Sequence, residues 1–144
     1  MRSDILNVNS QNTGSAKQKV VNLTVAATLT EADSGKVFML DSAGGAYSIT
    51  LPTGSSIEDG ILYKFYVSEE TPTGAITIAA GSAIVSFVQK DAGGNASNST
   101  VGTQISNIVI GTSAQKSAYI ELMAAGGEWV GFVLSGIDNA ITTS

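Results

Sequence analysis

Short runs of β-branched and aromatic residues, separated by turn-forming residues, recur from residue 20 to the end of this chain. Val, Ile, Thr, Tyr and Phe pack well on a pleated sheet, and no window of helical length shows an apolar repeat of 3.6 residues. The pattern therefore predicts an all-β fold of about nine strands over residues 20–144. We expect the strands at 20–28, 36–41, 47–51, 61–67, 75–80, 83–89, 105–110, 117–123 and 129–134.

The connections between these runs are rich in helix caps and turn residues. Segments 30–33 and 55–58 match the S/T-x-x-D/E capping box, and each predicts a single helical turn. Segment 91–100 is a long polar loop of low complexity. Strands joined in this way build a single jelly-roll-like sandwich or barrel, and the sequence does not separate these two architectures.

Alternation within a strand predicts which side chains face the core, because successive side chains point to opposite faces. In 61–67 the apolar face contains Phe65, which we expect to be buried. In 129–134 the more apolar face holds Val130, Phe132 and Leu134, so Phe132 is predicted to be a core residue as well.

Trp129 is the single tryptophan and falls on the face opposite to Phe132. An aromatic ring at the rim of a sheet can pack against a partner subunit or stack on a sugar. Sugar binding would also require convergent polar side chains, which the sequence does not place. We therefore predict Trp129 as a possible interface residue.

Residues 1–19 differ in composition from the rest and are expected to form a flexible or extended N-terminal arm. The arm is polar and carries a net charge of +2, whereas residues 20–144 carry −7. A short apolar cluster and three basic side chains could anchor it to another protein. The candidate contact residues of the arm are Arg2, Ile5, Leu6, Val8, Lys17 and Lys19.

The chain contains no histidine and no cysteine. These are the residues that most often provide acid-base chemistry near neutral pH, thiol nucleophiles and transition-metal ligands. The loop residues Asp91, Asn95 and Asn98 offer oxygen ligands for Ca²⁺, but their spacing does not match an EF-hand. We expect no catalytic residue, no metal site and no cofactor.

The overall composition favours self-association over binding to nucleic acid or membranes. Hydrophobic residues make up 43% of the chain and charged residues only 13%, which predicts an apolar surface that other chains cover. The net charge of −5 disfavours contact with a phosphate backbone. No window approaches the roughly 18 apolar residues that a membrane span requires.

Segments 29–41, 46–52 and 126–132 resemble a pattern in small structural proteins of tailed bacteriophages. That group includes head decoration (cement) proteins and domains of virion fibres, which are typically all-β modules that form trimers. The resemblance implies a homotrimer that binds the major capsid protein on the outer surface of the capsid and stabilises the shell. The arm lies outside the resembling segments, and its apolar cluster and opposite charge are the reasons why we expect it to be the docking element. The alternative is a receptor- or glycan-binding domain of a phage fibre or spike.

Overall fold

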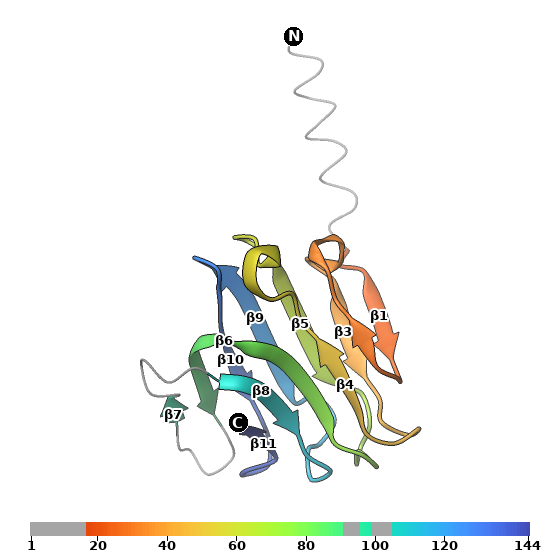
Figure 1. The fold of residues 1–144 in the computed structure, drawn as a ribbon. Helices are drawn as coiled ribbons and strands as arrows, with labels where there is room; N and C mark the ends of the chain where they lie inside the picture. Colours follow the sequence, from red (N-terminus) through yellow and green to blue (C-terminus); the bar gives the residue numbers. More distant parts are fainter. Residues whose placement is uncertain (1–16, 91–95, 99–104) are drawn as a thin grey trace, which may run out of the picture.

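Strands that follow one another in the first half of the chain alternate between two layers. The computed structural model describes residues 17–90, 96–98 and 105–144, and Figure 1 shows β1, β3, β5 and β9 side by side behind β4, β6 and β8. The elements are β1 (Val20–Leu23), β2 (Ala27–Thr28), η1 (Glu31–Asp33), β3 (Val37–Leu40), β4 (Tyr47–Thr50), η2 (Gly54–Ser56), β5 (Leu62–Val67), β6 (Ile76–Lys90), β7 (Ala96–Asn98), β8 (Ile105–Ile110), β9 (Tyr119–Ala125), β10 (Glu128–Leu134) and β11 (Ile141–Thr143).

The strand pairing makes one sheet that folds back on itself as a nearly closed barrel. Its main path runs β1-β3-β5-β9-β10-β6-β4-β2. Neighbours in β1-β3-β5 and in β2-β4-β6 are parallel, and each crossover between parallel neighbours passes through the opposite layer. The β9-β10 hairpin then joins the layers, because β9 pairs with β5 and β10 pairs with β6.

The two ends of the sheet, β1 and β2, are separated by only residues 24–26. The Tyr47 hydroxyl on β4 donates a hydrogen bond to the Leu23 carbonyl of β1 at 2.7 Å, across the open side of the barrel. The predicted all-β class is therefore confirmed, and the observed form of the sheet corresponds to the barrel alternative.

Several strand boundaries differ from the prediction. The expected strand 20–28 is divided between β1 and β2, which lie in different layers. The expected strands 75–80 and 83–89 form the continuous strand β6, in which the pairing with β8 shifts register between Ala79 and Ile84. Gly81 lies in this irregular stretch with φ +59°, a conformation that favours glycine. Strands β7 and β11 were not predicted.

The cap prediction is confirmed for η1 and wrong for η2. In η1 the Asp33 carboxylate accepts a hydrogen bond from the Thr30 backbone N–H at 2.9 Å. In η2 the equivalent bond runs from the Thr53 N–H to the Ser56 hydroxyl at 3.1 Å, so the turn begins before the predicted segment 55–58. The turn begins at Gly54, which adopts φ +56°, a conformation that favours glycine.

A cluster of stacked aromatic rings forms the centre of the barrel. Phe38 stacks on Phe65 with ring centroids 5.4 Å apart, and Tyr63 contacts Trp129 at 5.3 Å. All four side chains are buried, which confirms the prediction for Phe65. The Tyr63 hydroxyl donates to the Thr30 carbonyl at 2.7 Å, so the cluster also fixes the start of η1.

The predicted orientation of β10 is wrong. Trp129 is fully buried, whereas Phe132 is 36% exposed and Leu134 46% exposed. Both faces of this strand are apolar in sequence, so alternation alone could not choose between them. The inward face is the one that contains Gly131, where an added Cβ would lie 1.9 Å from the carbonyl oxygen of Glu121 on β9.

Replacing Phe65 by Ala should lower the free energy of unfolding by about 3 to 5 kcal/mol, because it opens a cavity in the aromatic cluster. Replacing Phe132 by Ala should cost about 1 to 2 kcal/mol, because that ring is partly exposed. Denaturant unfolding followed by Trp129 fluorescence at submicromolar concentration measures both changes. Equal losses for the two variants would show that β10 faces the other way.

Replacing Gly131 by Ala should destabilise the fold by about 1 to 3 kcal/mol or more, because the new methyl group meets the backbone of β9. Gly136→Ala is the matched control, since no atom lies within 4 Å of its added Cβ. We expect the control to change the unfolding midpoint very little. A Gly131→Ala protein as stable as the control would contradict the close approach of β9 and β10.

Candidate functional site

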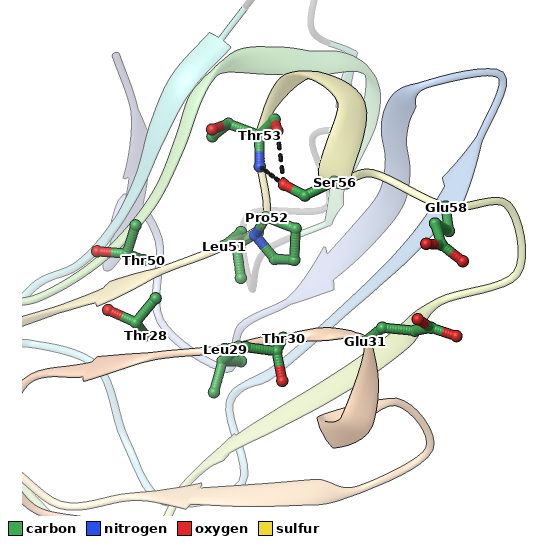
Figure 2. Close-up of a pocket in the computed structure, with 10 residues that line it drawn as sticks. All are labelled: Thr28, Leu29, Thr30, Glu31, Thr50, Leu51, Pro52, Thr53, Ser56 and Glu58. Carbon is green, nitrogen blue, oxygen red and sulfur yellow. Dashed lines mark hydrogen bonds between the residues drawn. The ribbon is translucent and has the colours of Figure 1, made fainter.

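A groove lies between η1 and η2, as Figure 2 shows. Its volume is about 400 Å³. The buried side chains of Leu29, Leu51 and Pro52 contribute apolar surface, and the remaining wall is polar. The polar lining consists of Thr28, Thr30, Glu31, Thr50, Thr53, Ser56 and Glu58.

The groove offers hydroxyl groups and two carboxylates, those of Glu31 and Glu58. Figure 2 places these two carboxylates on the same side of the view. Hydroxyls and carboxylates can bind a polar ligand through hydrogen bonds. A hydrolytic serine or threonine would also need an adjacent base to activate it. Within residues 17–90, 96–98 and 105–144, no group of three or more His, Cys, Asp and Glu could hold a metal ion. The hydroxyls and carboxylates of the groove thus have the chemistry to bind a polar ligand.

Trp129 supports the groove from inside the barrel. Its indole N–H donates to the Pro52 carbonyl at 3.2 Å, and its ring is fully buried against Tyr63. Burial also raises the pKa of Tyr63 to about 12. The ring of Trp129 is fully buried inside its own barrel and leaves no surface for a sugar or a partner subunit, which does not fit its prediction as a possible interface residue.

Lys36, beside the groove-lining turn η1, forms an ion pair within the chain. The Lys36 ammonium lies 2.5 Å from Asp33 Oδ1, and this hydrogen bond lowers the pKa of the Asp33 carboxyl. The ion pair bridges the end of η1 and the start of β3. Lys36 thus has a structural partner within the chain.

A second candidate surface is the outward side of β5, β9 and β10, which we call the outer face. The strand register arranges its side chains in three rows across these strands. The rows are Leu62-Met123-Val130, Lys64-Glu121-Phe132 and Tyr66-Tyr119-Leu134.

The outer face has its own aromatic contacts. The rings of Tyr66 and Tyr119 lie 4.6 Å apart, and those of Tyr119 and Phe132 lie 5.5 Å apart. The Tyr119 hydroxyl donates to the Glu121 carboxylate, and burial together with this bond raises the pKa of Tyr119. Sequence reasoning missed this surface. The available signal was that both alternating faces of residues 128–134 are apolar.

The arm residues fall mostly outside the described part of the chain. Lys17 and Lys19 are exposed, and the Lys19 carbonyl accepts a hydrogen bond from the Val37 N–H at 2.9 Å. The arm therefore joins the barrel beside the start of β3. The other predicted contact residues, Arg2, Ile5, Leu6 and Val8, lie outside the described residues.

The predicted calcium loop also falls largely outside the described residues. Asp91 and Asn95 are not described, and Asn98 is described only as the end of the β7 backbone. In the described part of the chain, no helix is long and apolar enough to cross a membrane.

No family model matches this chain, and no curated protein matches it.

Proposed function

We propose that this protein is a decoration protein of a bacteriophage capsid, which binds the outside of the shell as a homotrimer and stabilises it. The observation that carries the proposal is an all-β barrel with a polar, basic arm at one edge and an apolar outward sheet face. Sheet modules of this kind suit a structural role, since an exposed apolar face marks an interaction surface. The resemblance of segments 29–41, 46–52 and 126–132 to phage structural proteins supports the same conclusion.

The proposed partner is the major capsid protein, and the proposed location is the outer surface of the virion. Each trimer would bind across the seams between capsid subunits and add contacts that the bare shell lacks. Three arms on one trimer would bind cooperatively, because one bound arm holds the others at high effective concentration. The proposed role involves no enzymatic reaction, no cofactor, no nucleic acid and no membrane.

The arm is the proposed docking element. Its charge of +2 is opposite to the −7 of residues 20–144, and Ile5, Leu6 and Val8 give it a small apolar anchor. Fully extended, a segment of 19 residues reaches up to about 60 Å, which is enough to cross a neighbouring capsid subunit. Ordering such a segment costs entropy, so binding through a single arm should be weak.

Deleting residues 1–16 should abolish co-sedimentation with emptied, undecorated capsids while leaving the barrel folded. The deletion ends before Lys17 so that the hydrogen bond from Val37 to Lys19 is retained. The matched control replaces the polar arm residues Asn9 and Gln11 by Ala and should bind like the wild type. If the truncated protein decorates capsids as well as the full chain, the arm is not the docking element.

The alternative function, a receptor- or glycan-binding domain of a fibre or spike, is favoured by one observation. The groove between η1 and η2 combines hydroxyls and carboxylates with an apolar wall, which is the chemistry that a saccharide can contact. The groove lacks the aromatic platform that the sequence suggested, because Trp129 is buried.

A glycan-array screen with wild-type protein and the Glu58→Gln variant separates the two functions. We expect no saccharide-specific binding if the protein decorates capsids. Specific binding that Glu58→Gln weakens at least tenfold would favour the recognition domain. Glu70→Gln is the control, because that exposed carboxylate lies outside the groove.

A further inference from the structure

The outer face is unusually apolar for one side of a sheet that faces solvent. Antiparallel sheets commonly carry polar side chains on the side that contacts water. Here Met123 is 44% exposed, Leu134 46% and Phe132 36%, and the ring of Phe132 contacts Tyr119, which contacts Tyr66, in tilted arrangements. Side chains held by such contacts lose little conformational freedom when a partner covers them, which lowers the cost of binding.

The apolar surface extends beyond the three strands that define the outer face. The register of β3 and β1 places Val37 in line with Lys64, Met39 in line with Tyr66, and Val20 in line with Val37. A surface five strands wide, at strand spacings of about 4.8 Å and a rise of about 3.3 Å per residue, covers about 400 Å². This area contains the charged pair Lys64 and Glu121 in its middle row, and the exposed apolar side chains around that pair are the ones that a partner would cover.

The charges of the outer face favour a second copy of this chain as its partner. Lys64 and Glu121 are register neighbours, and together with Glu128, which points to the same side of β10, they leave the face at −1, whereas residues 20–144 carry −7. Copies that meet through this face bring fewer like charges together than copies that meet through the rest of the barrel. In a closed ring of three copies, Lys64 of one copy can pair with Glu121 of the next.

We infer that the outer face is the contact surface between copies of this chain. The inference deepens the proposed homotrimer and rests on it, because it assigns the self-association to named residues. Met123, Phe132 and Leu134 become buried in the assembly, and the rings of Tyr66 and Tyr119 keep their contact with each other.

The double variant Phe132→Glu/Leu134→Glu tests the assignment by placing two charges in the contact. Light scattering after gel filtration at about 10 μM should report three chains for the wild type and one for this variant. Val25→Glu/Thr112→Glu is the matched control: it adds the same charge at exposed positions away from the outer face and should remain trimeric. An outer-face variant that stays trimeric, or a wild type that is monomeric, would overturn the inference.

A cysteine-labelling experiment decides the question if the charged variant fails to fold, as judged by Trp129 fluorescence. The natural sequence contains no cysteine, so Met123→Cys and Val25→Cys each carry a single thiol. In trimeric protein we expect iodoacetamide to modify the Met123→Cys thiol at least tenfold more slowly than the Val25→Cys thiol. The two rates should become equal in urea. Equal rates in the trimer would place the contact elsewhere.

Capsid co-sedimentation of the wild type separates this inference from the proposed function. A trimer that protects the Met123→Cys thiol but does not bind capsids supports the inference and contradicts the decoration function. A monomer that binds capsids overturns the inference and leaves the decoration function standing.

Discussion

The pairing of the β9-β10 hairpin with both layers is the constraint on which the rest of the barrel depends. β9 completes the layer of β1, β3 and β5, and β10 completes the layer of β2, β4 and β6. The close approach of the two hairpin strands at Gly131 leaves no space for a Cβ, and Trp129 fills the interior beside it. The same pairing turns Phe132 outward, so it determines both the core and the outer face.

Hydrogen bonds of buried side chains fix the loops that connect the strands. Trp129 and Tyr63 bind the carbonyls of Pro52 and Thr30, which border the groove. The buried Ser42 hydroxyl accepts hydrogen bonds from the Thr73 and Gly74 N–H groups at 3.0 and 3.1 Å and so ties two loops together. In the described residues every buried side-chain nitrogen and oxygen has a partner, which avoids the cost of an unsatisfied polar group.

The proposed function follows from what this arrangement presents to its surroundings. The barrel offers an apolar face of low charge, a polar groove and a basic arm that joins beside β3. A decoration protein would use the face for self-association and the arm for the shell, so that weak single contacts add up through valency. The groove is the feature that would matter most in a recognition domain.

The sequence by itself determined the all-β class, the positions of most strands, the burial of Phe65 and the cap of η1, because these depend on local periodicity and local hydrogen bonds. The parallel order of the strands and the joining of 75–80 with 83–89 into β6 required long-range pairing, which local pattern does not encode. The orientation of β10 is the clearest case. Both of its faces are apolar, and only the tertiary structure, through the contact between Gly131 and β9, decided that Trp129 is buried and Phe132 is exposed.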